Sequence, residues 1–165
     1  LLIDACRLMD RHMTRNPYLV FVGSGGQERR LREMASNLDW IKFLGFHNQS
    51  ELPAIYSMAD VFVMPSQAEP WGLAVNEAMA AGTAVISTTD CGCSTDLIDN
   101  TVGRSVPAND GPALARAIEE VLVDAERCLA MGQAARKRVA AWSFTEDLVG
   151  LNRALKIVSE LPNST

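Results

Sequence analysis

Short apolar runs without polar alternation recur along the chain and are separated by helical patterns. The runs YLVFV at 18–22 and VFVM at 61–64 are typical of strands that are buried on both faces. Their alternation with helical stretches favours βαβ units and a parallel sheet that carries helices on both faces. The 165-residue chain is therefore expected to fold as one α/β domain with a Rossmann-like, three-layer architecture.

The expected elements alternate up to about residue 124, after which the pattern is wholly helical. We expect strands at 18–22, 40–44, 61–64, 84–87 and 103–106. We expect helices at 1–13, 27–37, 50–58, 72–81 and 110–124, with Ser50 as the N-cap of the third. Residues 125–161 should form a helical extension with an apolar stripe at Phe144, Leu148, Leu151, Leu155 and Val158.

Charge and cysteine content exclude several classes of partner. The net charge is -5 and the basic residues are scattered, so nucleic acid is not an expected partner. The sequence has neither an apolar run of membrane-spanning length nor a signal-peptide pattern, which favours a cytoplasmic location. Of the four cysteines, Cys91 and Cys93 form a C-x-C pair, but no second pair or suitably spaced His accompanies them. We therefore expect reduced thiols and no metal site.

Ligands of open parallel sheets bind at the carboxyl ends of the strands, so the loops that follow the strands are candidate sites. In the first such loop, VGSGG, Gly23, Ser24 and Gly25 would let backbone N–H groups approach a phosphate closely. The glycines do not complete a dinucleotide-binding or P-loop motif. A plain tight turn explains this loop equally well. In the second loop, LGFHNQSE at 44–51, His47 should lie on the crevice side of the sheet. The alternative is an exposed loop histidine.

The third loop, AEPWGLAVNEAMAAG at 68–82, carries two glutamates eight positions apart. Gly72 is the expected helix start, which leaves the N–H groups of Gly72, Leu73 and Ala74 free to bind an anion such as a diphosphate. Glu77 lies five residues further, about 7.5 Å along the helix, and could accept hydrogen bonds from a vicinal diol. Glu69 would lie on the other side of that anion. The alternative is a capping carboxylate and a solvated helix glutamate.

This stretch resembles the signature of the retaining GT-B glycosyltransferases known as glycosyl transferases group 1. Glu69 and Glu77 match the E-x7-E pair, and EAMAAGTAVI at 77–86 matches the run that follows it. The segments LVFVGSGG, IKFLGF, YSMADVFVMPS and WSFTEDL are also similar to the family, so the resemblance covers essentially the whole chain. Cys91-Gly92-Cys93 followed by Asp96 departs from the usual glycine pair and glutamate.

The resemblance implies a donor-binding C-terminal lobe that takes a UDP- or GDP-linked sugar for retaining transfer in glycan biosynthesis, without a cofactor or metal. Glu77 would bind the ribose hydroxyls, and Glu69, the candidate catalytic residue, would contact the transferred sugar. The amides of Gly72, Leu73 and Ala74 would contact the diphosphate. The turn that touches the base would be formed by Phe46, His47 and Gln49, with the loop of Gly23, Ser24 and Gly25 on the donor side.

The resemblance also implies that parts of the fold lie outside this sequence. The family's N-terminal acceptor lobe is expected to be absent, as is the first strand, which is central in the order 3-2-1-4-5-6. The phosphate-gripping Arg and Lys belong to the same absent segment. We expect the half-sheets either to close up or to receive a strand from another chain or from further residues of the protein. We also expect no sugar transfer by this chain alone. Peripheral membrane association through the absent lobe stays open.

Two other functions compete with donor binding. A non-catalytic nucleotide-binding or interaction module could keep this lobe without the chemistry. A nucleotide-sugar epimerase of the related two-lobe fold is disfavoured, because such enzymes lack the E-A-M-A-x-G run found here. The motifs do not specify the base, the sugar or the acceptor.

Overall fold

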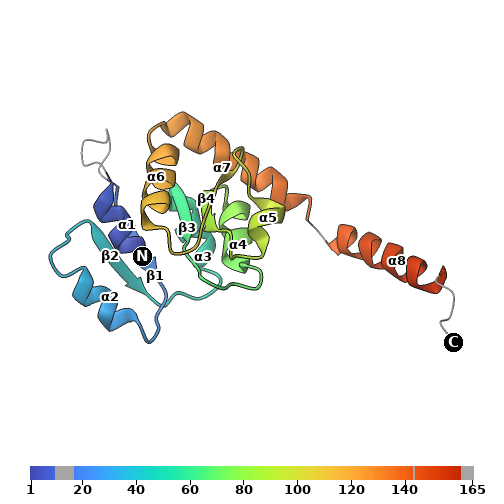
Figure 1. The fold of residues 1–165 in the computed structure, drawn as a ribbon, viewed down its shortest axis with the longest axis horizontal. Helices are drawn as coiled ribbons and strands as arrows, with labels where there is room; N and C mark the ends of the chain where they lie inside the picture. Colours follow the sequence, from blue (N-terminus) through green and yellow to red (C-terminus); the bar gives the residue numbers. More distant parts are fainter. Residues whose placement is uncertain (10–16, 143, 161–165) are drawn as a thin grey trace.

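The computed structural model describes residues 1–9, 17–142 and 144–160, in which helices and strands alternate (Figure 1). The strands are β1 (Leu19–Val22), β2 (Ile41–Gly45), β3 (Val61–Met64), β4 (Ala84–Thr88) and β5 (Gly103–Val106). The helices are α1 (Leu2–Leu8), α2 (Glu28–Met34), α3 (Leu52–Met58), α4 (Leu73–Ala81), α5 (Cys93–Leu97), α6 (Gly111–Leu122), α7 (Ala125–Ala140) and α8 (Phe144–Glu160).

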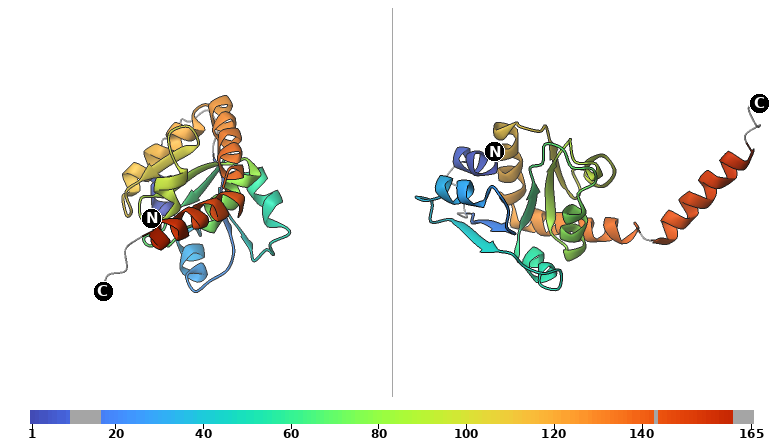
Figure 2. Two further views of the ribbon diagram at one scale, coloured as in Figure 1. Left: turned by 90° about the vertical axis from the view of Figure 1, so that its right-hand side faces the viewer. Right: turned by 90° about the horizontal axis from the view of Figure 1, so that it is seen from below.

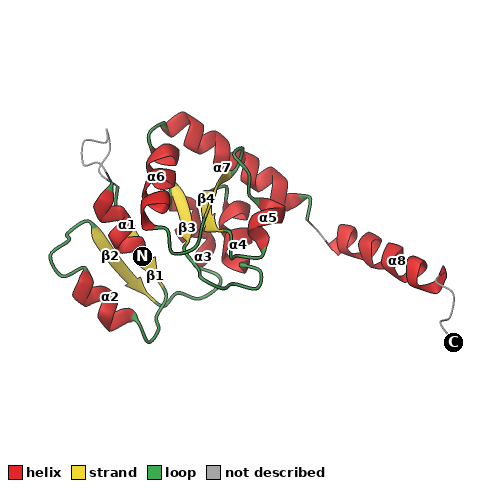
Figure 3. Cartoon of the chain, in the orientation of Figure 1, coloured by secondary structure: helices red, strands yellow, loops and turns green. Residues whose placement is uncertain are grey.

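The strands form two separate parallel sheets, as Figure 3 shows. One sheet pairs β1 with β2, and the other has the order β3-β4-β5. The α/β class and the parallel pairing are confirmed. The half-sheets do not close up, since no backbone ladder joins β1 to β3 within the described ranges. The break falls where the expected strand order places its central strand.

Helices cover both faces of the three-stranded sheet. β4 is buried along its whole length, as its uninterrupted apolar pattern predicts. Ala84 and Ile86 face the core that α1 and α6 cover, whereas Val85 faces the core that α4 and α5 cover. Burial of Val85 and of Ile86 stabilises the fold by about 1.5–3 kcal/mol each, so the sheet gives α4 a rigid support.

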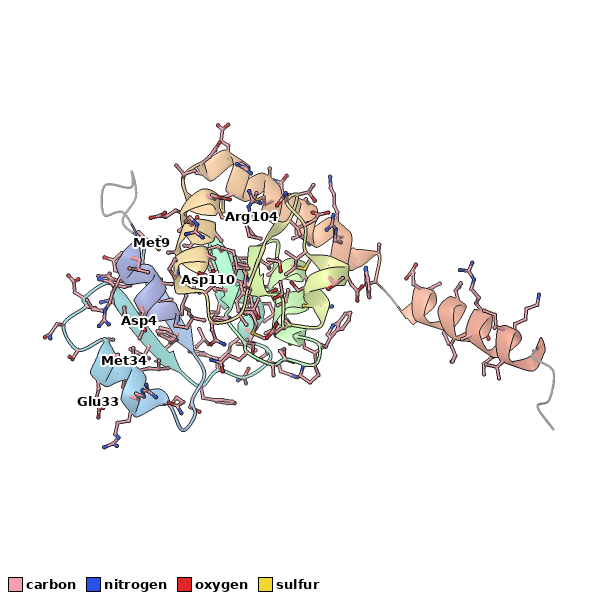
Figure 4. The ribbon with its side chains drawn as sticks, viewed as in Figure 1. Asp4, Met9, Glu33, Met34, Arg104 and Asp110 are labelled. Atoms are coloured by element: carbon pink, nitrogen blue, oxygen red, sulfur yellow. The ribbon has the colours of Figure 1, made fainter. Side chains whose placement is uncertain are left out.

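Helix α1 contributes to the cores of both sheets. Ile3 is buried with residues of β1, β2 and α2. Ala5 and Met9 are buried against α6 and the three-stranded sheet, and Figure 4 labels Met9 on the side of α1 that faces α6. The two half-sheets are therefore held together by a shared helix rather than by strand pairing.

Two aspartates start the consecutive helices α6 and α7. The carboxylate of Asp110 accepts a hydrogen bond from Ala113 N at 2.8 Å, and that of Asp124 accepts one from Arg127 N at 3.0 Å. Within α7, Gly132 packs so closely on the end of α4 that a Cβ there would overlap the carbonyl oxygen of Gly82. This close approach fixes α7 against α4.

Several predicted boundaries are corrected. Helix α1 ends at Leu8, and the rest of the predicted span, 10–13, lies outside the described residues. Helix α2 is shorter than predicted, and α5 was not predicted at all. Ser50 is not an N-cap: its N–H and its hydroxyl both donate to Asn48 Oδ1, and Glu51 precedes the helix instead.

Helix α8 projects away from the body of the molecule (Figure 2). Most of its predicted apolar stripe, at Leu148, Leu151, Leu155 and Val158, is exposed. The side chain of Phe144 lies outside the described part. Among the helices of the described ranges, none has the length and apolarity required to cross a bilayer.

Candidate functional site

The glycine loop after β1 is open. Gly23 has a φ of +113°, and its N–H donates to Gly45 O at 2.7 Å, which ties together the ends of β1 and β2. A Cβ at Gly23, Gly25 or Gly26 would meet no atom within 4 Å, so glycine is required only at Gly23, where the positive φ demands it. Ser24 is exposed. The loop is therefore sterically open, which fits both a phosphate-facing turn and a plain tight turn.

The loop after β2 presents an exposed aromatic ring. Phe46 is 75% exposed, and Gln49 is also exposed. His47 is half-buried, which is contrary to the alternative of an exposed loop histidine. Its Nδ1 is enclosed and makes no hydrogen bond among the described residues, although Glu51 Oε2 lies 3.5 Å away. Glu51 Oε2 instead accepts a hydrogen bond from Asn48 N at 3.0 Å.

The loops after β3 and β4 are joined by backbone hydrogen bonds. Glu69 N donates to Asp90 O at 3.1 Å, and Gly92 N donates to Glu69 O at 2.9 Å. Cys93 N donates to Trp71 O at 2.8 Å. A Cβ at Gly92 would overlap the carbonyl oxygen of Pro70, so glycine is required there. The Cys-Gly-Cys departure thus forms the support beneath the loop that carries Glu69.

The two thiols of this support lie directly under the start of α4. Cys91 and Cys93 are buried, with their Sγ atoms 3.5 Å apart. A Cβ at Gly72 would lie 2.5 Å from Cys91 Sγ and 3.2 Å from Cys93 Sγ. Gly72 also has a φ of +100°, in the left-handed region that favours glycine. Both the backbone conformation and the space available therefore require glycine at the start of α4.

The carboxylate of Glu69 lies against the two residues that precede α4. Its Oε1 accepts hydrogen bonds from Gly72 N at 3.1 Å and from Trp71 N at 3.4 Å. Glu69 therefore acts as a capping carboxylate at the N-terminal end of α4, which is the alternative interpretation of its position. The N–H groups of Leu73 and Ala74 have no acceptor among the described residues. Two of the three predicted anion-binding amides are therefore free, and the third is held by Glu69.

Glu77 lies on the exposed side of α4 and is held by a residue from α3. Tyr56 Oη donates a hydrogen bond to Glu77 Oε2 at 2.9 Å. Burial, together with the hydrogen bond to Glu77, raises the pKa of Tyr56 to about 12, so the phenol is a proton donor at neutral pH. Sequence reasoning missed Tyr56, although it opens the segment YSMADVFVMPS on which part of the resemblance rests.

A groove of about 400 Å³ runs beside Glu77 between α4 and α7. Its walls are Asn76, Glu77, Ala80, Arg136, Val139 and Ala140. Asn76 is oriented by Trp71, whose indole Nε1 donates to Asn76 Oδ1 at 3.2 Å. The ring of Trp71 in turn contacts Trp142, with 5.7 Å between ring centroids. Glu77 is therefore bordered by Tyr56 of α3 and, across the groove, by residues of α7.

The predicted residues form two groups that follow the two sheets. Glu69, Gly72, Leu73, Ala74 and Glu77 gather at the start of α4. The glycine loop and the turn at 46–49 lie at the ends of β1 and β2, and no hydrogen bond connects them to the first group within the described ranges. No three His, Cys, Asp or Glu side chains of the described residues gather as a metal site would require.

Comparison with known proteins identifies the family. The model of the family described as glycosyl transferases group 1 matches residues 1–138. The chain belongs to this family. Among curated relatives, the GDP-mannose-dependent alpha-(1-6)-phosphatidylinositol monomannoside mannosyltransferase of Mycobacterium tuberculosis (strain CDC 1551 / Oshkosh) is 35% identical over 133 residues. That match covers 74% of this chain and 34% of the relative, so the chain spans about a third of the relative's length.

Two solved structures of other proteins share the fold. The sucrose-phosphate synthase of Thermosynechococcus elongatus is 30% identical with a TM-score of 0.76, over 95% of this chain and 43% of that one. Anabaena HepE, solved in complex with UDP-glucose, matches with a TM-score of 0.73 at 23% identity, over 97% of this chain and 44% of that one. Both matches support the Rossmann-like GT-B architecture.

Proposed function

We propose that this chain is the donor-binding lobe of a retaining, metal-independent glycosyltransferase and that it binds a UDP- or GDP-linked sugar at the start of α4. The observation that carries this proposal is the arrangement of free backbone donors and one carboxylate on a single helix. The N–H groups of Leu73 and Ala74 lack acceptors among the described residues, and Glu77 follows them within about one turn. Membership of the group 1 family supports the same assignment.

In the proposed complex the diphosphate lies at the N-terminus of α4. Its negative charge is stabilised there by the helix dipole and by the amides of Leu73 and Ala74. Charge that develops on the departing diphosphate during transfer would be stabilised by the same groups. Glu77 accepts hydrogen bonds from the ribose hydroxyls, and Phe46, His47 and Gln49 contact the base.

Glu69 has two roles in this proposal. Without donor it caps α4 through Gly72 N, at 3.1 Å. When the diphosphate arrives, Gly72 N becomes a phosphate contact and the Glu69 carboxylate is released toward the transferred sugar. Glu69 is therefore a candidate catalytic residue. Before the donor binds, its hydrogen bond to Gly72 N holds the backbone at the start of α4 in the conformation that binds the anion.

Titration calorimetry of the 165-residue chain with UDP, GDP, UDP-glucose and GDP-mannose tests donor binding. We expect measurable binding of one nucleotide class, and weaker binding of the same nucleotide to Glu77→Gln by about tenfold, because a hydrogen bond to a charged acceptor contributes about 1.5–3 kcal/mol. Glu33→Gln on α2 is the matched control, since Glu33 is also an exposed helix glutamate. Equal affinity of Glu77→Gln and the unaltered chain would contradict the assignment.

A non-catalytic interaction module is the second candidate, and the capping role of Glu69 favours it, because a purely structural carboxylate needs no substrate. Absence of binding to every nucleotide tested would support this candidate. We also expect no sugar transfer by this chain alone, because the acceptor site belongs to the N-terminal lobe in the family. Turnover of a nucleotide sugar by the purified chain would overturn that expectation.

A further inference from the structure

We propose that Tyr56 is a positioning residue for donor recognition: it holds the carboxylate of Glu77 with Oε2 occupied and Oε1 presented to the ribose hydroxyls. This inference rests on the proposed function and adds a residue to it. The contact that carries it is the hydrogen bond from Tyr56 Oη to Glu77 Oε2, which is 2.9 Å long and joins α3 to α4.

Tyr56 is itself fixed from two further directions. Its ring meets Phe62 of β3 edge to face, with 5.5 Å between centroids and an interplanar angle of 83°. Its carbonyl oxygen accepts a hydrogen bond from the buried Thr83 Oγ1 at 2.7 Å. The phenol oxygen is therefore a donor at a fixed place beside α4, anchored on the sheet core.

Glu77 needs such an anchor because little else restrains it. Its side chain is exposed on α4, and an exposed glutamate samples several rotamers that binding must reduce to one. Tyr56 removes part of that entropic cost before the ligand arrives, and preorganisation of this kind strengthens binding without a new ligand contact. Since Tyr56 uses Oε2, the remaining oxygen, Oε1, has no partner among the described residues and is the one available to a diol.

A ribose-specific effect follows from this arrangement. If Tyr56 acts through Glu77, its phenol should matter for ribonucleotides and matter little for nucleotides that lack the 2′-hydroxyl. The high pKa of Tyr56, about 12 through burial and the hydrogen bond to Glu77, keeps the phenol protonated throughout the neutral range. The effect should therefore be independent of pH between about 6 and 9.

The test is titration calorimetry of UDP, GDP and their 2′-deoxy counterparts with the 165-residue chain and four variants. The variants are Tyr56→Phe, Glu77→Gln, the double variant and Tyr18→Phe, the last being the control at an exposed tyrosine. We expect Tyr56→Phe to weaken binding of the ribonucleotide about three- to tenfold, as the loss of one hydrogen bond predicts. We expect a smaller change for the deoxynucleotide, no further loss in the Glu77→Gln background and no change for Tyr18→Phe.

Each of the other possible outcomes contradicts either the proposed function or the role of Tyr56. If the unaltered chain binds no nucleotide, the proposed function is wrong and the inference falls with it. If the chain binds and Glu77→Gln weakens binding while Tyr56→Phe does not, the inference alone is wrong. Equal weakening for ribo- and deoxynucleotides would assign Tyr56 a structural role and overturn the proposal.

A second variant covers the case in which Tyr56→Phe does not fold. Glu77→Asp keeps a carboxylate on the exposed side of α4 and shortens its reach, so the contact with Tyr56 is lost while the helix surface stays charged. We expect the same three- to tenfold loss for the ribonucleotide. Unchanged affinity of Glu77→Asp would contradict the positioning role.

Discussion

Glu69 and Gly72 are joined by a hydrogen bond of 3.1 Å, in which the amide of Gly72 donates to the carboxylate that stands three residues before it. The bond places an acidic side chain beside the N-terminus of α4, on the residue that precedes its first turn. This is the polarity that a helix N-terminus favours, because the dipole attracts negative charge there.

Replacement of Glu69 should therefore affect stability as well as donor binding. We expect Glu69→Ala to lower the free energy of unfolding by about 0.5–1.5 kcal/mol, the usual net contribution of an intramolecular hydrogen bond. Glu69→Gln keeps an oxygen acceptor and should cost less. Urea unfolding followed by circular dichroism measures both variants. Equal stability of Glu69→Ala and the unaltered chain would show that the cap contributes nothing.

The start of α4 should tolerate no side chain at position 72. We expect Gly72→Ala to destabilise the chain by at least about 1–3 kcal/mol, because a non-glycine residue with a positive φ is strained and the new methyl would meet the thiols of Cys91 and Cys93. Gly25→Ala is the matched control, since a Cβ there meets nothing within 4 Å. Thermal unfolding of both variants gives the comparison, and similar losses at the two positions would refute the packing argument.

Stability in acid should depend on a contact between α7 and the loop before β5. Arg138 Nη2 lies 2.8 Å from Asp99 Oδ2, and the hydrogen bonds from Arg138 and Thr101 hold the pKa of Asp99 well below its usual range. An unfolded Asp titrates near 3.9. The stabilisation is therefore present above that pH and is lost as the pH falls from about 4 toward the folded pKa.

Arg138→Ala should remove this contribution at pH 7. Asp99 is about half exposed, at 52%, so the ion pair itself is worth no more than about 1 kcal/mol after screening by solvent. The difference in unfolding free energy between the variant and the unaltered chain should shrink at pH 3. Lys137→Ala, at the neighbouring exposed position, is the control. A difference that stays constant between pH 7 and pH 3 would rule out this pair as its source.

The cysteines of the folded chain should resist alkylation. Burial raises the pKa of Cys6 to about 11, and burial with the hydrogen bond to Cys91 raises that of Cys93 to about 12. The thiolate, which is the reactive form, is therefore scarce at pH 8. We expect iodoacetamide to modify these two positions far more slowly in the folded chain than in urea, as mass spectrometry can follow. Rapid labelling of Cys93 without denaturant would mean that the loop support opens readily.

Much of the fold could be predicted because short apolar runs mark its strands. Of the described strands, only β4 is buried along its whole length, whereas Val20 and Val22 of β1 are exposed, so the expectation that the run at 18–22 is buried on both faces is wrong. The spans 61–64 and 103–106 match β3 and β5, and Gly72 and Gly82 bracket α4 as predicted. Helix α5 escaped prediction because Cys, Ser, Thr and Asp are weak helix formers and the helix has five residues. Backbone hydrogen bonds from Gly92 and Cys93 to the neighbouring loop set its start, and no local pattern encodes them.

The site was predicted less completely than the fold. The spacing of Glu69 and Glu77 pointed to α4 as the candidate site, but it did not decide whether the Glu69 carboxylate binds the backbone at the start of that helix. Tyr56 lies 21 residues before Glu77 on another helix, and such a contact leaves no periodicity in the sequence. Asn48, rather than Ser50, organises the turn before α3 because its side-chain oxygen accepts two hydrogen bonds locally.

Helix α1 has a consequence for cooperativity. Ile3 is buried beneath β1 and β2, and Ala5 is buried against α6, so the departure of α1 would expose apolar surface on both sheets at once. Local unfolding around either sheet therefore carries the free-energy cost of exposing apolar surface on both sheets. The two sheets should behave as one folding unit whose weakest point is the docking of a single short helix.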